Sequence, residues 1–280
     1  MKTRAFGPAS TGVSVIGQGT WNLELADRAE AIRTLQRGID FGMTHIDTAE
    51  MYGSGRAEAL TGDAIAGRRD KVFLVSKVLP SNASRKGTLA ACERSLKHLK
   101  TDYLDCYLLH WRGSYELEET FAAFDELKSA GKIRAWGVSN FDTDDLEEAL
   151  AVAGKGTIAC NQVLYHLRER AIEHAVIPWC EENGVAVVAY SPFGQMASPS
   201  PASPGGKVLA EVAKANGATP RQVELAFLTR KDAVFAIPKA SKVAHAEENA
   251  GAGDLVLTAS EIEAIDRAFP RGRAKSLPML

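Results

Sequence analysis

The chain lacks the features that mark membrane, secreted or nucleic-acid-binding proteins. Its four cysteines form no C-x-x-C pair, and three lie within apolar or amphipathic stretches, which favours buried reduced thiols over disulfides or a metal site. No apolar run approaches the length of a membrane span, and the N-terminus has no continuous apolar segment of the kind found in secretory signals. The net charge is -2, with no long run of one sign. We therefore expect a cytoplasmic protein with no membrane or nucleic-acid partner.

Short apolar runs alternate with longer amphipathic stretches along most of the chain. The runs are apolar throughout, which is typical of strands covered on both faces. There are eight of them, at residues 13–17, 43–47, 72–76, 103–110, 133–139, 157–162, 185–190 and 233–238.

The stretches between these runs have the spacing of helices. In residues 28–42 an apolar side chain recurs every four residues, and residues 84–99 place Leu and Cys on one face behind Ser84, a candidate N-cap. Residues 171–184 end at Gly184, which fits the position just after a helix.

Eight strands alternating with eight helices predict an α/β fold, a parallel (β/α)₈ TIM barrel, with residues 1–280 as a single domain. The runner-up is an open doubly wound sheet, but no G-x-G-x-x-G follows the first run. Residues 191–207 are rich in Ser, Pro and Gly and predict either a mobile loop over a ligand site or a surface insertion.

Polar residues stand where the apolar runs end. In a barrel of this kind the carboxyl ends of the strands meet at one face, where active sites lie. An acid, a phenol, an amine and an imidazole gathered there predict a proton-transfer site, because a lysine lowers the pKa of a neighbouring phenol and an acid keeps the lysine charged. The residues at or just after these ends are Asp47, Tyr52, Lys77, His110, Ser139, Asn140, Gln162, Tyr190 and Lys239.

Five motifs in the same order resemble those of the aldo-keto reductase family, and the shorter bacterial diketogulonate and methylglyoxal reductases in particular. They cover most of the chain, from about Gly17 to about Asn249. The motifs are HIDTAEMYGSGRAE, VSKV, DYLDCYLLHW, GKIRAWGVSNF and IPKASKVAHAEEN. The resemblance implies an NAD(P)H-dependent oxidoreductase that reduces small aldehydes and ketones to alcohols.

The resemblance also implies a role for each of four catalytic residues. Tyr52 would be the general acid that protonates the carbonyl oxygen as hydride arrives from the nicotinamide. Lys77 would lower the pKa of Tyr52, and Asp47 would pair with Lys77. His110 would hydrogen-bond the carbonyl oxygen and orient it.

Cofactor contacts follow from the same motifs. Ser139, Asn140 and Gln162 would hold the nicotinamide carboxamide, since an amide pairs donor and acceptor with another amide. Tyr190 would stack under the nicotinamide, and both Ser191 and Phe193 would lie along the pyrophosphate.

The adenosine end of the cofactor is expected at the last motif, where the chain departs from the family. His245 stands where many members have an Arg for the 2′-phosphate, and Ala240 stands where they have Ser or Thr. Because imidazole lacks the permanent charge and fork of guanidinium, selection for NADPH over NADH should weaken. We expect NADPH, with NADH possible. The residues expected to contact it here are Lys239, Ser241, His245, Glu248 and Asn249, and Lys239, Ser241 and Lys242 would compensate for the missing Arg.

The substrate pocket is expected to have aromatic walls, Trp21, Tyr52 and Trp111, which favour small or apolar carbonyl compounds. The tail after the last helix is only PRGRAKSLPML, too short to close the pocket, so we expect an open site with broad specificity. Nothing marks an interface, and a monomer is expected.

Two other functions remain open. The chain could be a cofactor-binding, slow-turnover barrel that senses redox state as a partner subunit, since the four catalytic residues do not fix a rate. It could also be a metal-dependent hydrolase using His45, Asp47, His110 and His166, although no H-x-H or H-x-x-x-H spacing is present and our prediction is no metal.

Overall fold

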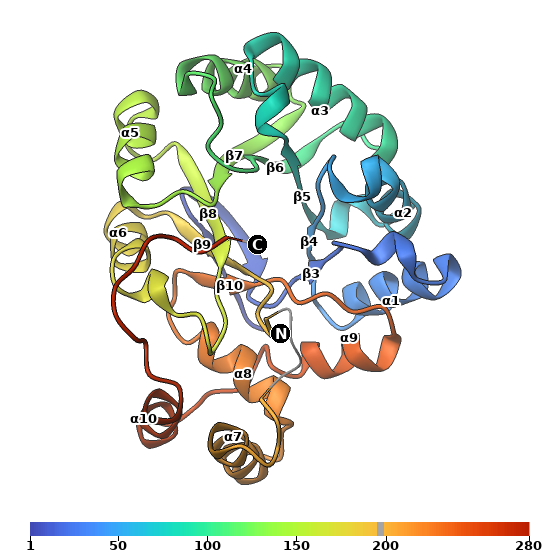
Figure 1. Cartoon of the computed structure of the whole chain (residues 1–280). Helices are drawn as coiled ribbons and strands as arrows, with labels where there is room; N and C mark the ends of the chain where they lie inside the picture. Colours follow the sequence, from blue (N-terminus) through green and yellow to red (C-terminus); the bar gives the residue numbers. More distant parts are fainter. Residues whose placement is uncertain (195–198, 280) are drawn as a thin grey trace.

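Parallel strands form the centre of the protein, and helices surround them (Figure 1). The computed structural model describes residues 1–194 and 199–279. Neighbouring strands pair in the order in which they follow one another along the chain. They are β3 (Gln18–Gly19), β4 (His45–Asp47), β5 (Phe73–Val78), β6 (Leu104–Leu109), β7 (Ile133–Ser139), β8 (Ile158–Leu164), β9 (Ala186–Tyr190) and β10 (Val234–Ala236).

The two ends of this sheet meet and close it into a barrel. The amide of Gly17 donates to the carbonyl of Ala236 at 2.8 Å, and the amide of Gly19 donates to the carbonyl of Pro238 at 3.1 Å. Parallel bridges join Ile16 to Ala236 and Gly19 to Lys239. The prediction of a (β/α)₈ barrel is therefore confirmed.

The outer helices follow the strands one by one, except near the C-terminus. Two helices, α7 and α8, lie between β9 and β10, and α10 follows α9, so the predicted simple alternation is wrong there. Thr219 with Gln222, and Thr258 with Glu261, form the capping boxes that start α8 and α10. The helices are α1 (Arg28–Asp40), α2 (Arg56–Ala64), α3 (Arg85–Leu99), α4 (Leu117–Ser129), α5 (Thr143–Ala153), α6 (Val176–Asn183), α7 (Pro204–Ala215), α8 (Pro220–Leu228), α9 (Val243–Ala250) and α10 (Ala259–Ala268).

Two predicted helix boundaries are confirmed. Ser84 caps α3, with its side chain accepting from the amide of Gly87. Gly184 ends α6 at a φ of 66°, a left-handed conformation that costs glycine little. The four cysteines are also buried and reduced, as expected.

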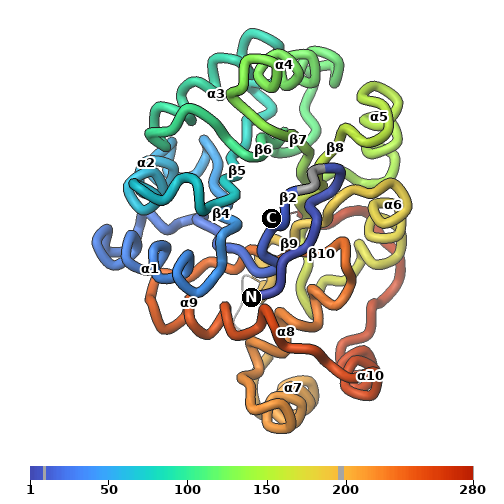
Figure 2. The backbone as a smooth tube through the Cα atoms, turned by 180° about the vertical axis from the view of Figure 1, so that it is seen from behind, coloured from blue at the N-terminus to red at the C-terminus, as the bar shows by residue number. Residues whose placement is uncertain are grey.

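The predicted first barrel strand, residues 13–17, is only partly right. Val13 and Ser14 end an antiparallel hairpin of β1 (Thr3–Phe6) and β2 (Ala9–Ser14), whereas Ile16 and Gly17 pair with Ala236 at the barrel closure, just before β3. An apolar run has the same sequence pattern in a hairpin strand and in a barrel strand, because its periodicity does not reveal which strand pairs with it. Figure 2, seen from behind, shows the N-terminal segment crossing the barrel opening on that face.

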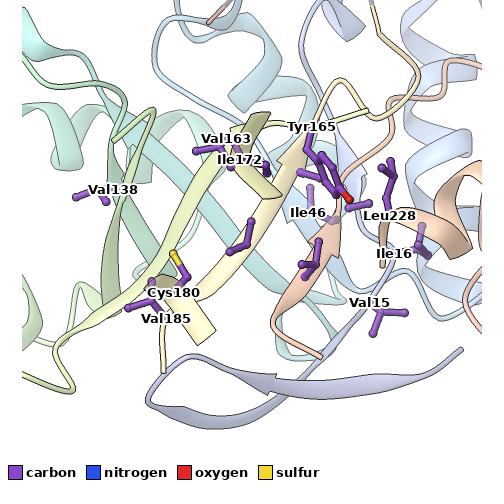
Figure 3. Packing of buried hydrophobic residues seen from close by; sticks show 14 of the residues in the cluster. Val15, Ile16, Ile46, Val138, Val163, Tyr165, Ile172, Cys180, Val185 and Leu228 are labelled. Atoms are coloured by element: carbon purple, nitrogen blue, oxygen red, sulfur yellow. The ribbon is translucent and has the colours of Figure 1, made fainter. Parts of the chain in front are cut away.

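The core has two layers. One lies between strands and helices, and Figure 3 shows part of it around β8, β9 and β10, with Val163, Cys180 and Leu228 among its labelled members. The other fills the barrel itself and includes Phe6 and Val13 of the hairpin. The hairpin is thus the floor of the barrel, opposite the face where the strands end.

Candidate active site

The alternation of side chains along each strand decides which polar residues enter the barrel. On β5, Phe73 and Val75 belong to the interior cluster, so two residues further on Lys77 also points inward. The same step of two leads from Cys160 on β8 to Gln162. The polar strand ends therefore form the layer directly above the apolar barrel interior.

Tyr52 reaches this layer from a tight turn rather than from a strand. Gly53 and Ser54 follow it with φ values of 56° and 55°, and Gly55 continues the left-handed stretch at 85°. A Cβ at Gly55 would also lie 2.3 Å from the ring of His98. The Tyr-Gly-Ser-Gly sequence thus lets the chain fold back and bring the phenol over Lys77.

Lys77 is the centre of the hydrogen-bond network at the site. Its Nζ donates to Oδ1 of Asp47 at 2.5 Å, to the hydroxyl of Tyr52 at 3.2 Å and to the carbonyl of Thr48 at 2.8 Å. The side chain is fully buried. Burial lowers the pKa of Lys77, but the Asp47 carboxylate and Tyr52 raise it by more, so the ammonium stays charged.

Asp47 is held on both carboxylate oxygens. Oδ2 accepts from Nε2 of Gln162 at 2.7 Å, while Oδ1 faces Lys77. Burial raises the pKa of Asp47, and the contacts with Lys77 and Gln162 offset only part of that rise. An ion pair this deep needs both partners, because either charge alone would be uncompensated.

The expected lowering of the Tyr52 pKa is wrong for this structure. Burial of the phenol raises its pKa and outweighs the lowering by the charge of Lys77. The physical reason is that Tyr52 loses solvent on entering the pocket, which disfavours the phenolate. Tyr52 is therefore protonated at neutral pH, the state that a proton donor requires.

His110 lies beside Tyr52, with 5.8 Å between the ring centroids and a 72° angle between the planes. Burial and then the charge of Lys77 hold the pKa of His110 well below its usual value, so the imidazole is neutral. Its buried Nδ1 has no hydrogen-bond partner among the described residues. The His110 ring lines the same cavity as the Tyr52 hydroxyl, and a neutral imidazole in that position suits the orientation of a carbonyl oxygen.

A cavity of about 550 Å³ opens above these residues. Trp21, Met51 and Trp111 contribute apolar surface to its wall, and the polar strand ends contribute hydrogen-bonding groups. The full lining is Gly19, Thr20, Trp21, Asn22, Asp47, Met51, Tyr52, His110, Trp111, Ser139, Asn140, Gln162, Tyr190, Ser191, Pro192, Phe193, Gly194, Ile237 and Lys239.

Asn140 ties three strand ends together in the middle of the cavity. Its Nδ2 donates to the carbonyl of His110 and to the hydroxyl of Ser139, both at 3.2 Å, and its Oδ1 accepts from the hydroxyl of Tyr190 at 3.0 Å. Asn140 adopts a left-handed φ of 59°, and Ser191 does so at 48°. Such conformations at non-glycine residues cluster at ligand sites, where surrounding contacts hold them.

The structure does not bring every predicted cofactor residue into the cavity. Lys239 is in the lining, but Ser241, His245, Glu248 and Asn249 are not. They lie on and just before α9, where His245 is exposed and Asn249 is buried. Conversely, Asn22, Met51 and Ile237 line the cavity although the sequence analysis did not single them out, and the strand-end rule alone would have found only Ile237, two residues before Lys239.

The donor set fits a nicotinamide cofactor. Asn140 and Gln162 offer amides that can pair with a carboxamide, and Tyr190 offers an aromatic face in the same cavity. A metal ion fits less well. Within residues 1–194 and 199–279, no three His, Cys, Asp or Glu side chains gather as ligands. His45 instead lies at the barrel floor, 5.6 Å from the rings of both Phe6 and Phe73.

The C-terminal tail folds back against the barrel. After α10 it runs back towards the barrel mouth (Figure 1), where Lys275 pairs with Glu169 at 2.6 Å and Leu277 packs against the main core. None of the described tail residues lines the cavity, so the expectation that the tail is too short to close the pocket is not contradicted. Of the predicted loop at 191–207, residues 195–198 lie outside the described residues.

Comparison with known proteins agrees with this geometry. A sequence model of the Aldo/keto reductase family matches residues 15–269. The methylglyoxal reductase YeaE of Escherichia coli is 44% identical over 263 residues, which is 93% of each chain. The glyoxal reductase of Bacillus subtilis is 32% identical over 252 residues, 89% of this chain and 87% of the relative.

Solved structures are similar over the whole chain. A Klebsiella pneumoniae aldo-keto reductase in complex with NADPH superposes with a TM-score of 0.92 at 43% identity, covering 100% of both chains. The thermostable aldo-keto reductase Tm1743, in complex with the inhibitor epalrestat, gives a TM-score of 0.89 at 39% identity, covering 96% of this chain and 100% of that one.

In the described part of this chain, every helix is too short or too polar to cross a membrane.

Proposed function

Because this chain belongs to the aldo/keto reductase family, and is therefore an NAD(P)H-dependent oxidoreductase, we propose that it reduces small aldehydes and ketones with NADPH and that Tyr52 is the general acid. The observation that carries the proposal is the contact between the Nζ of Lys77 and both Asp47 and the Tyr52 hydroxyl. NADPH is supported by the Klebsiella relative, which was solved with it. When bound, the cofactor supplies the hydride.

The residues of this chain would then handle the proton and the carbonyl oxygen. Tyr52, protonated because burial raises its pKa, gives its proton to that oxygen. The charge of Lys77, 3.2 Å away, stabilises the phenolate that remains. The neutral imidazole of His110 orients the oxygen by a hydrogen bond.

The substrate we propose is an uncharged small carbonyl compound, with 2-oxoaldehydes such as methylglyoxal as the first candidates. The substrate end of the cavity is lined by Trp21, Asn22, Met51 and Trp111, none of which carries a charge. The names of the relatives support this class, since one reduces methylglyoxal and another glyoxal.

Replacing Tyr52 tests the proposal. Tyr52→Phe should lower kcat for methylglyoxal by about 10²- to 10⁴-fold, the usual contribution of a general acid, while the Kd of NADPH changes little. Tyr103→Phe is the matched control, since Tyr103 precedes β6 at the opposite end of the barrel. Undiminished turnover in Tyr52→Phe would assign the acid wrongly. A wild-type kcat far below 1 s⁻¹ with every simple carbonyl tried would favour the slow, redox-sensing alternative.

A further inference from the structure

We propose that Arg221 selects NADPH over NADH by binding the phosphate on the adenosine ribose, a role that rests on the proposed function. Arg221 is the second residue of α8, two positions after the cap residue Thr219. The sequence analysis did not single it out, because nothing in a helix-start sequence reveals which loop it meets.

The first step is the contact between Arg221 and the cavity wall. Its Cζ lies 4.9 Å from the centre of the Phe193 ring, and Phe193 lines the cavity. A guanidinium over an aromatic face is attracted by the negative face of the ring quadrupole and keeps its hydrogen-bond donors available. The described residues offer Arg221 no carboxylate partner, so the five N–H groups remain open to an anion.

The second step is the direction in which a nicotinamide cofactor must extend. Its reactive ring has to lie beside Tyr52 and His110 in the middle of the cavity. The substrate end is walled by Trp21 and Trp111, so the phosphates and adenosine leave by the end lined with Phe193 and Lys239. Phe193 and the segment around Lys239 therefore flank the path of the adenosine.

The third step is the position of α8 relative to α9. Nε2 of Gln222, the neighbour of Arg221, donates to the carbonyl of Glu248 at 2.9 Å. This bond fixes the start of α8 against α9, the helix that carries His245. Arg221 thus lies between the loop of Phe193 and the helix α9. That position suits the adenosine ribose better than the pyrophosphate, which lies nearer the nicotinamide.

The cations near this end of the cavity differ in exposure and in geometry. Lys239 and Lys242 are exposed point charges, and His245 is an exposed imidazole. Arg221 is half-buried, permanently charged and forked, which is the geometry that binds a phosphate with two parallel hydrogen bonds. We therefore assign to Arg221 the discrimination that His245 is poorly suited to give.

Binding of 2′,5′-ADP and 5′-AMP tests this assignment without turnover, because the two probes differ by the ribose phosphate. By calorimetry, Arg221→Ala should weaken 2′,5′-ADP at least about 10-fold, the loss of one charge-assisted contact, and change 5′-AMP by less than about 2-fold. Arg221→Lys should fall between wild type and Arg221→Ala. Steady-state KM values should follow the same pattern for NADPH against NADH, with kcat at saturating NADPH unchanged.

Arg37→Ala is the matched control, because its guanidinium lies 4.8 Å from the Phe41 ring at the far end of α1, away from the cavity. It should leave both affinities unchanged. An equal loss of affinity for 2′,5′-ADP and 5′-AMP in Arg221→Ala would overturn the proposal, because Arg221 would then contact a group that both molecules share. Unchanged 2′,5′-ADP binding would overturn it too. If the wild type binds 2′,5′-ADP well yet reduces no carbonyl compound, the proposed function fails while the role of Arg221 stands.

Discussion

At the scale of single residues, the barrel interior separates two polar groups that the sequence places only two positions apart. Asp47 points into the site and is paired with Lys77. His45 points to the same side of β4 but one layer lower, and is fully buried among Phe6, Phe73 and Phe235. Neither of its ring nitrogens has a partner among the described residues. The H-x-D pair is therefore one residue of the candidate site, Asp47, and one core residue, His45.

This placement predicts that His45 lowers the free energy of unfolding as the pH falls. Burial lowers its pKa to about 3, whereas an unfolded histidine titrates near pH 6.5. Between those values only the unfolded chain is protonated at this position, so stability is lost as pH falls below 6.5. The slope is about 1.4 kcal/mol per pH unit, or about 2 kcal/mol at pH 5.

His45→Leu should remove this cost. Urea unfolding at pH 7 and pH 5 should show the variant gaining about 2 kcal/mol relative to wild type between the two conditions. His174→Leu serves as the control, because His174 is exposed and contacts only the carbonyl of Gly272 among the described residues. If the unfolding free energies of wild type and His45→Leu change with pH in parallel, His45 is not held neutral in the folded state.

At the scale of elements, the N-terminal hairpin is what closes the barrel floor. Phe6 of β1 is fully buried in the interior cluster, 4.8 Å from the ring of Phe73 and 5.2 Å from that of Phe235. At Gly7, a Cβ would lie 2.1 Å from the carbonyl oxygen of Ala159, so the hairpin turn touches the start of β8 directly. The hairpin is therefore part of the core rather than a loose extension.

Phe6→Ala should cost about 3–5 kcal/mol of stability, the usual loss for truncating a buried aromatic side chain. The KM for NADPH should not change, because the site lies at the opposite end of the barrel. Denaturant unfolding and steady-state kinetics measure the two quantities. Phe41→Ala, at the end of α1 outside the barrel interior, provides the comparison, and a cost equal to that of Phe6→Ala would contradict the role of the hairpin as a floor.

At the scale of the whole molecule, barrel closure joins the first strand to the last. The bonds from Gly17 to Ala236 and from Gly19 to Pro238 couple the N-terminal and C-terminal halves. Arg170 adds a second tie, since it contacts Glu173, the carbonyl of Phe269 and Asp266 of α10. We therefore expect residues 1–280 to unfold as one cooperative unit.

Cofactor binding should stabilise this unit as a whole. NADPH at 100 times its Kd should add about 2.7 kcal/mol, which raises the Tm by roughly 4–5 °C for a chain of this size. Far-UV and near-UV circular dichroism should report the same midpoint with and without NADPH. Tyr52→Phe should show the same shift, because the hydroxyl is not needed for binding. Two separate transitions would contradict a single domain.

The sequence alone determined the strand ends and the chemistry gathered there. Apolar runs mark strands reliably when both faces are covered, and parallel strands bring their carboxyl ends to one face whatever the loops do. That was enough to group Asp47, Lys77 and His110, and the motifs added Tyr52. Helix ends such as Ser84 and Gly184 followed from capping chemistry, which is local.

Only the tertiary structure decided what depends on contacts between distant segments. The hairpin at the floor, the tail against Glu169 and the stacking of Arg221 on Phe193 all join residues that no local pattern connects. The raised pKa of Tyr52 has the same origin, since burial is a property of the folded chain and here outweighs the charge of Lys77. Residue types and spacing thus fix which groups meet, whereas packing fixes how deeply they are buried and what else reaches them.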